Sequence, residues 1–95
     1  MADKNTGIGL KIKMLREEKE ISMDLMVFDL TNKYEIRIDK SMLSRWENGV
    51  NEPSLARAVV LAKYFDCSLD FLIGLTDDRT PARLRAYANK LNKRD

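Results

Sequence analysis

The chain has 95 residues, of which 44% are hydrophobic and 34% are charged, and its formal net charge is +2. This length supports one small domain with a single core and excludes a second, while so small a net charge neither indicates nor excludes a nucleic-acid partner. A single cysteine excludes an intramolecular disulfide and a cysteine-based zinc site, and the absence of histidine removes the commonest general base and metal ligand.

No stretch of the sequence points to an enzyme, a membrane span or a secretion signal. Glycine-rich phosphate loops and nucleophile-elbow patterns are absent, and the apolar runs are too short to cross a bilayer. Residues 1–11 lack the apolar core of a signal peptide. We therefore expect a cytoplasmic protein that is not an enzyme and that uses no cofactor or metal.

The N-terminal part predicts an arm followed by a helix. Residues 1–7 are polar, and we expect them to be flexible. A first helix is predicted over residues 8–20, because Ile8, Ile12 and Leu15 recur at helical spacing and form one stripe that can face a core. Most charged residues of this segment fit an ordinary solvated helix face.

A second helix is predicted to begin after Ser22, a good N-cap, and to continue to about Lys33. Two conformations remain open for residues 31–37, TNKYEIR. Either the helix continues for one to two turns, which places Tyr34 on the same stripe as Leu30, or the segment forms a bulging loop. We favour the longer helix, followed by an extended stretch, because the next residues alternate polar and apolar and include β-branched side chains.

The third predicted helix is short and has two contrasting faces. Asp39 is its N-cap and Asn48-Gly49 its stop, since glycine adopts a left-handed backbone without steric cost. One face carries an apolar stripe that should be buried: Met42, Leu43 and Trp46. The other face is polar and can donate hydrogen bonds: Lys40, Ser41, Ser44 and Arg45.

Three more helices are predicted after the third. Ser54 caps the fourth, and Ser68 caps a short fifth that ends at Gly74. Thr80-Pro81 opens the sixth, which runs to about Lys93. The fourth carries a broad apolar stripe that should lie in the core: Leu55, Ala58, Val59, Leu61, Ala62 and Phe65. The sixth has a narrower stripe that can serve as core, as a dimer seam or as both: Leu84, Tyr87, Ala88 and Leu91.

The end of the third helix, SRWENG followed by NEPSL, strongly resembles the Cro/C1-type (XRE-like) helix-turn-helix family of phage and bacterial repressors. The run AKYFDCSLDFLIGL is also similar to this family. The resemblance implies an all-α, five-helix lambda-repressor-like DNA-binding domain over residues 8–75, with residues 76–95 as an additional C-terminal helix and basic tail. It implies a transcriptional regulator, a repressor of the phage type, that binds double-stranded DNA in a sequence-specific manner.

Matching the family residue by residue implies roles for the polar residues. The candidates for base contacts lie on the third helix: Lys40, Ser41, Ser44 and Arg45. Arg45 is the strongest candidate for a specific base contact, because arginine can donate two parallel hydrogen bonds to guanine. Lys40 either reads guanine or holds a phosphate. Phosphate contacts are expected from residues around this helix: Ser22, Lys33, Arg37, Asn48, Asn51 and Ser54. The family also implies an ion pair of Arg16 with Glu47 that braces the first helix against the third.

The chain departs from the family pattern at two places. Met23 stands where family members usually carry Gln, so one phosphate donor is lost, although Ser22 and the helix N–H groups remain. From Ser22 to Trp46 the chain is also about six residues longer than the common pattern, which has a tight glycine-containing turn after the second helix. Some phage repressors are similar to this longer arrangement.

Two kinds of protein partner are expected besides DNA. Family members generally pair two recognition helices on a two-fold operator, and the sixth helix offers a contact for such a homodimer. A modulating protein is the second, because a compact core would leave an apolar patch on the second helix: Met23, Leu25 and Phe28. An antitoxin or partner-regulated interaction module on the same fold is the alternative function.

Overall fold

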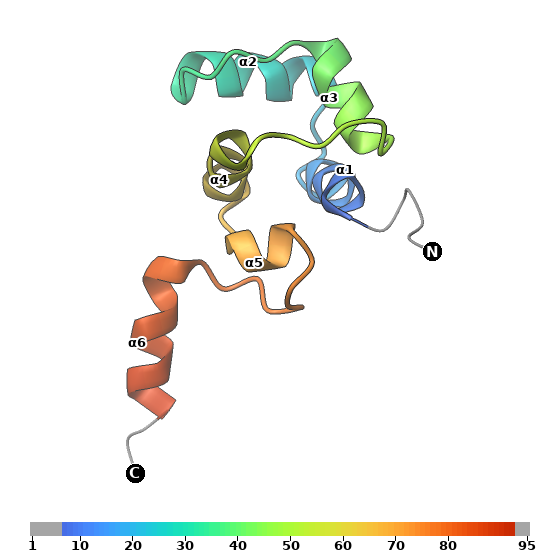
Figure 1. The fold of residues 1–95 in the computed structure, drawn as a ribbon. Helices are drawn as coiled ribbons and strands as arrows, with labels where there is room; N and C mark the ends of the chain where they lie inside the picture. The colour runs from blue at the N-terminus through green and yellow to red at the C-terminus, as the bar shows by residue number, and fades with distance from the viewer. Residues whose placement is uncertain (1–6, 93–95) are drawn as a thin grey trace.

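The computed structural model describes residues 7–92, except for the side chains of residues 88, 89 and 92, and within this range every regular element is a helix (Figure 1). The helices are α1 (Ile8–Glu18), α2 (Met23–Lys33), α3 (Lys40–Glu47), α4 (Leu55–Phe65), α5 (Leu69–Leu72) and α6 (Ala82–Asn92). The predicted all-α fold is confirmed. None of these helices has the length and apolar character needed to cross a bilayer. Apart from Gly7, the expected N-terminal arm lies outside the described residues, as do residues 93–95.

Four helices begin at polar side chains that cap them. The side chains of these residues each accept a hydrogen bond, 2.8 to 3.2 Å long, from the backbone N–H three positions later: Ser22, Asp39, Ser54 and Ser68. Each bond satisfies an N–H group that has no partner within its helix. The starts of α2 to α5 were therefore predicted correctly from local chemistry. Helix α6 starts at Ala82, one residue after the predicted Pro81.

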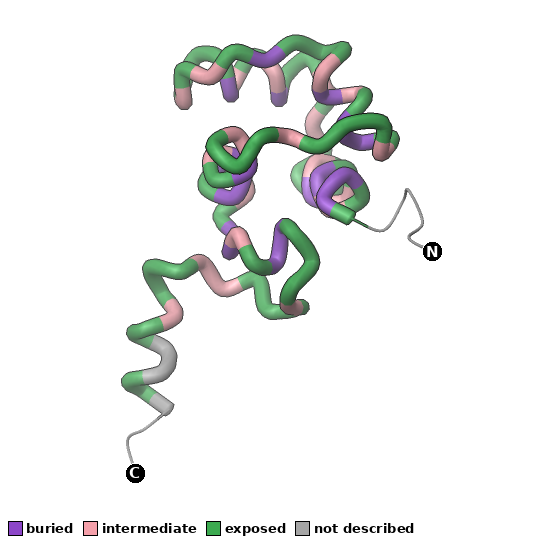
Figure 2. The backbone as a smooth tube through the Cα atoms, viewed as in Figure 1, coloured by how far each residue is buried: buried purple, intermediate pink, exposed green. Residues whose placement is uncertain are grey.

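The first five helices enclose one hydrophobic core, visible as the buried positions that face one another in Figure 2. Every one of these helices contributes to the innermost side chains: Ile12, Met26, Leu30, Leu43, Leu61 and Leu72. Trp46 belongs to the same core, with 4% of its surface exposed. Cys67 is buried there as well, and burial raises the pKa of its thiol, which is the behaviour of a small structural side chain.

The apolar stripe of α4 is buried over only part of its length. Ala58, Leu61 and Ala62 lie in the core, but Leu55 is 71% exposed and Val59 is 36% exposed. Leu55 is the first residue of α4, one turn before the helix reaches the core, and Val59 borders a surface pocket. The prediction of a continuous core stripe is therefore wrong for these two residues.

Helix α1 ends two residues earlier than predicted. Its last helical residue is Glu18, and Glu20 has a left-handed backbone with φ 57°. The backbone N–H of Ile21 then donates to the carbonyl of Arg16 over 3.4 Å. Helix propensity favoured continuation, but this turn is needed to direct the chain into α2.

The segment between α2 and α3 adopts the conformation that we favoured. Helix α2 continues to Lys33, and the chain then returns in extended form along the same helix (Figure 1). On this path the N–H of Ile36 donates to the carbonyl of Leu30 over 3.4 Å, and Nζ of Lys40 lies 3.5 Å from Oδ2 of Asp24. Although α2 is longer than in the common family pattern, the N-terminus of α3 therefore lies beside the N-terminus of α2.

Helix α6 projects away from the five-helix core (Figures 1 and 2). Its described apolar side chains are exposed: Leu84 by 44%, Tyr87 by 63% and Leu91 by 47%. The segment before it is fixed more firmly, because the N–H of Ser68 donates to the carbonyl of Arg79 and the Arg79 guanidinium donates twice to Glu18. The stripe of α6 is not part of the core, and Ala88 lies outside the described side chains.

Candidate nucleic-acid interface

Helix α3 separates an apolar face from a polar face. Leu43 is fully buried and Trp46 nearly so, while Met42, predicted to be core, is only half-buried at the edge. On the opposite side the predicted base-contact residues lie together and, apart from half-buried Ser44, are exposed: Lys40, Ser41, Ser44 and Arg45. The described acidic side chain of this helix, Glu47, is buried and faces inward. The solvent-exposed surface of α3 therefore offers hydrogen-bond donors and positive charge.

Two contacts with α1 fix the position of α3. Arg16 donates from Nε and Nη2 to the two carboxylate oxygens of Glu47, over 2.7 and 3.0 Å, and the pair is largely buried. The bond to Glu47 raises the pKa of the Arg16 guanidinium, which stays charged. The backbones also approach closely, since a Cβ added at Gly9 would overlap the carbonyl oxygen of Trp46. Arg16 and Glu47 thus form the pair that the family pattern implied.

The end of α3 is shaped by Gly49, which has φ 74°. Its N–H donates to the carbonyl of Trp46 over 3.1 Å, and the N–H of Val50 donates to the carbonyl of Arg45 over 2.9 Å. These are the two bonds of a Schellman motif, in which a left-handed residue reverses the chain after a helix. The turn brings Asn51 back beside Arg45, and Asn48 donates to the carbonyl of Ser44 over 2.9 Å.

Two of the predicted phosphate contacts are exposed serines at helix N-termini. Ser22 and Ser54 use their oxygens as cap acceptors, so each hydroxyl keeps its hydrogen for an outside acceptor. The backbone N–H groups and the helix dipole add to the attraction for an anion such as a phosphate. Ser22 lies near the polar face of α3, because Lys40 contacts Asp24 in the first turn of α2.

The remaining predicted phosphate contacts are distributed unequally. Arg37 lies in the extended segment, and its carbonyl accepts two bonds from the Arg57 guanidinium over 3.0 and 3.2 Å. Lys33 is exposed at the last position of α2, about 15 Å along the helix from its first residue. The structure therefore gathers most of the predicted site around α3 and leaves Lys33 at the end of α2 remote from Lys40.

Sequence reasoning missed several contacts between segments that are distant in the chain. Gly9 lies against the carbonyl of Trp46, and Arg57 donates to the carbonyl of Arg37. The Tyr64 hydroxyl donates to Asp29 over 2.8 Å and joins α4 to α2. Burial and the bond to Asp29 raise the pKa of Tyr64, so its hydroxyl remains a donor. No local pattern marks them, although a glycine inside a helix at a place where alanine is preferred was a signal for Gly9. Among the described residues no cluster of three potential metal ligands occurs.

Comparisons with known proteins agree with this geometry. A family model described as a helix-turn-helix matches residues 12–72, which extend from α1 to the end of α5 and leave out α6. The chain is also 34% identical, over 71 residues, to an uncharacterized HTH-type transcriptional regulator, YobD, of Bacillus subtilis (strain 168). That alignment covers 75% of this chain and 58% of the relative, so the chain spans little more than half the length of this curated protein.

Proposed function

The chain belongs to the Cro/C1-type helix-turn-helix family, and from this premise we propose that it is a cytoplasmic transcriptional repressor that binds operator DNA in a sequence-specific manner. One observation carries the proposal: α3 is buried along one side and presents Lys40 and Arg45 along the other, with Glu47 neutralised inside by Arg16. A helix held in this way can enter the major groove as a rigid body and bring side chains to base edges.

The proposed contacts divide into two classes. Arg45 and Lys40, on the exposed face of α3, donate to base edges and supply specificity. Ser22 and Ser54, at the starts of α2 and α4, and Arg37, between α2 and α3, bind phosphates and set the position of the domain on the duplex. Repression then follows by occlusion, because a protein seated on an operator blocks access to an overlapping promoter.

The test compares substitutions from the two classes on a site selected from a randomised DNA library. We expect Arg45→Ala to lower affinity for the selected site more than for random DNA, and Arg37→Ala to weaken both equally with a salt slope smaller by about 1. Lys13→Ala, at an exposed position of α1 to which no DNA or dimer contact is assigned, is the matched control for loss of one positive charge. Equal binding of both DNAs by the parent protein would exclude sequence-specific recognition.

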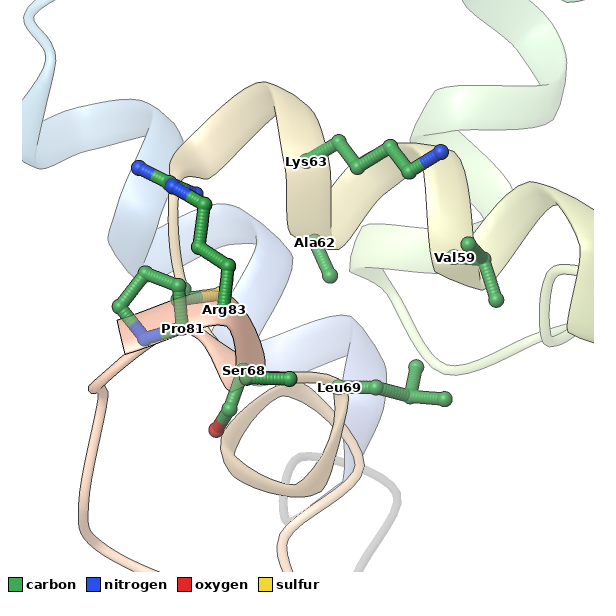
Figure 3. Close-up of a pocket in the computed structure, with 9 residues that line it drawn as sticks. Val59, Ala62, Lys63, Ser68, Leu69, Pro81 and Arg83 are labelled. Atoms are coloured by element: carbon green, nitrogen blue, oxygen red, sulfur yellow. The ribbon is translucent and has the colours of Figure 1, made fainter. Parts of the chain in front are cut away.

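The proposed repressor acts as a homodimer that pairs through α6. One recognition helix reads too few base pairs to single out a site in a genome, so a two-fold arrangement is required. The exposed stripe of Leu84, Tyr87 and Leu91 supports this contact. A pocket of about 260 Å³ at the base of α6, bordered by Val59 and Leu69 (Figure 3), offers further apolar surface to a second subunit.

Substitution of Leu84 and Leu91 by Ser tests this contact while the bonds of Arg79 to Glu18 remain. We expect cooperativity and affinity on a two-half-site operator to fall together, with unchanged binding to a single half-site. The control is Leu55→Ser with Ile73→Ser, because these exposed residues line a different hollow, next to the start of α4. Loss of cooperativity only in the control would place the dimer contact at that hollow.

A second candidate function, a partner-regulated or antitoxin-like module, is favoured by the outer face of α2. Phe28 is 62% exposed and Leu25 is 44% exposed, and both point away from the core with Asp24 beside them. We propose that a modulating protein binds there and blocks access to DNA. A Phe28→Ser variant that still binds DNA but no longer responds to such a partner in cells would support this role.

A further inference from the structure

Arg45 is held by two neighbours. Its Nη1 donates to Oγ of Ser41, one turn earlier in α3, over 2.7 Å. The oxygen of the Asn51 amide accepts from Arg45 Nε over 3.3 Å when the amide is oriented to satisfy its surroundings, and its nitrogen then donates to the carbonyl of Val50 over 3.1 Å. Two nitrogens of the guanidinium, Nη1 and Nε, are therefore each held by a neighbouring side chain.

Asn51 is itself fixed relative to α3. Its backbone N–H and that of Val50 both donate to the carbonyl of Arg45, over 3.4 and 2.9 Å, because Gly49 folds the chain back in the Schellman turn. The side chain and the backbone of Asn51 thus both contact the same residue. Because Asn51 is fixed at the end of α3 by these bonds, it is suited to orient the Arg45 side chain rather than to bind a phosphate.

We propose that Asn51 and Ser41 are positioning residues that hold the Arg45 guanidinium for end-on recognition of guanine, a refinement that rests on the proposed function. The assignment replaces the phosphate contact expected of Asn51 and the base contact expected of Ser41. It also limits which bases Arg45 can read.

The hydrogen count of the guanidinium sets this limit. Arginine has five N–H hydrogens, of which Asn51 takes the one on Nε and Ser41 takes one on Nη1. The fork that includes Nε is therefore occupied at Nε, whereas Nη1 keeps one hydrogen and Nη2 keeps two. With Ser41 on the Cδ side of Nη1, the end-on fork of Nη1 and Nη2 is open to an outside acceptor. In the major groove guanine offers two adjacent acceptors, O6 and N7, while adenine offers N7 beside the N6 donor. The held guanidinium therefore matches guanine and opposes adenine.

Holding the side chain also affects how strongly it discriminates. A free arginine must lose rotamer freedom when it binds, and a side chain already fixed loses less. Removal of either neighbour should therefore leave Arg45 charged and attracted to DNA but less selective among bases. This predicts a change in the ratio of affinities rather than in affinity for DNA as such.

The first arm of the test identifies the base. In the selected operator one guanine per half-site should depend on Arg45, and its replacement by adenine or by 7-deazaguanine, which lacks the N7 acceptor, should weaken binding by roughly 5- to 150-fold. The Arg45→Ala variant should bind all three sites alike. If the parent protein selects an operator but no guanine shows this dependence on Arg45, the inference is wrong and the proposed function stands.

The second arm uses paired variants of the two positioning residues. Asn51→Ala and Ser41→Ala should each lower the guanine-to-adenine affinity ratio while binding to random DNA and its salt slope stay as in the parent. Asn51→Asp and Ser41→Thr retain an acceptor oxygen and should restore the ratio, even though the added charge of Asp weakens all DNA binding. If Asn51→Ala weakens binding to every sequence equally, Asn51 is a phosphate contact and the proposal fails. If the parent protein binds no DNA selectively, the proposed function itself fails.

Discussion

Two arginine–glutamate pairs join α1 to the rest of the protein, and they have nearly the same geometry. Arg16 and Glu47 connect α1 to α3 with bonds of 2.7 and 3.0 Å, and Arg79 and Glu18 connect α1 to the segment before α6 with two bonds of 2.8 Å. Their surroundings differ. The side chains of the first pair are 13% and 1% exposed, and those of the second are 48% and 47% exposed.

This difference in exposure distinguishes two regions: α3, which is held rigidly against α1, and α6, which is held only through an exposed pair. In the first region, a buried charge without its partner would be very unfavourable, so the pair ties α3 to α1 in one arrangement. In the second, water can replace either partner, and the pair adds little to stability. The recognition helix is thus part of the core, whereas α6 is attached to it through a short surface segment.

The largest expected contrast is between aromatic residues of the two regions. Trp46→Ala should destabilise the protein by ~3–5 kcal/mol, because a large core side chain is lost and a cavity remains. Tyr87→Ala, on the exposed face of α6, should leave the unfolding midpoint of the monomer unchanged. Denaturant titration at low protein concentration measures both. An unchanged midpoint for Trp46→Ala would show that α3 is not anchored through this residue.

Breaking the buried pair should have the next largest effect. Arg16→Ala leaves Glu47 buried and unpaired and also removes the bond from Arg16 to the carbonyl of Ile21, so we expect a loss of about 3 kcal/mol. The double variant Arg16→Met with Glu47→Leu should recover most of it, because no charge remains buried. Denaturant titration of the parent and the two variants measures the three unfolding free energies. A double variant as unstable as Arg16→Ala would mean that packing, not charge, accounts for the loss.

Gly9→Ala should cost about 1–3 kcal/mol through crowding, although alanine is the better helix former. The added methyl group would overlap the carbonyl of Trp46, and neither α1 nor α3 can move without disturbing the pair of Arg16 and Glu47. Gly7→Ala is the control for crowding, because open space surrounds that position and only the N-cap of α1 is weakened. Thermal unfolding of both variants measures the difference, and equal midpoints would show that α1 and α3 can separate readily.

These contacts also mark the boundary of what the sequence could predict. The caps at Ser22, Asp39, Ser54 and Ser68 depend on neighbours within three residues, and the apolar faces depend on helical spacing, so both were predictable. The contact of Gly9 with Trp46 depends on which backbones meet in three dimensions. No periodicity contains that information, and the pair of Arg16 with Glu47 was anticipated only through the family resemblance.

The same boundary divides the candidate site. The polar face of α3 follows from helical spacing, so Lys40, Ser41, Ser44 and Arg45 could be grouped from sequence. The position of Asn51 beside Arg45 could not, because it depends on the angle at which the chain leaves the turn at Gly49. Lys33 was grouped with the phosphate contacts because local signals predict the extended form of residues 35–39 but not its direction, back along α2 to α3 (Figure 1).

The smallest expected effect comes from the exposed pair and depends on pH. The bond from Arg79 lowers the pKa of Glu18, so the folded state favours the ionised carboxylate. A group of this kind contributes stability that is present above its unfolded pKa, about 4.3, and is lost as the pH falls through its lower folded pKa.

Glu18→Gln tests the ion pair alone. Replacing Arg79 would also remove its contact with the Phe71 ring, whose centroid lies 5.0 Å from the guanidinium. We expect Glu18→Gln to lower the melting temperature slightly near neutral pH, by less than Trp46→Ala, Arg16→Ala or Gly9→Ala. The difference from the parent should shrink in acid, where both proteins lack the charge at this position. Melting curves across the acid range measure this. A loss as large as that of Arg16→Ala would show that the attachment of α6 is as rigid as that of α3, and the contrast between the two regions would disappear.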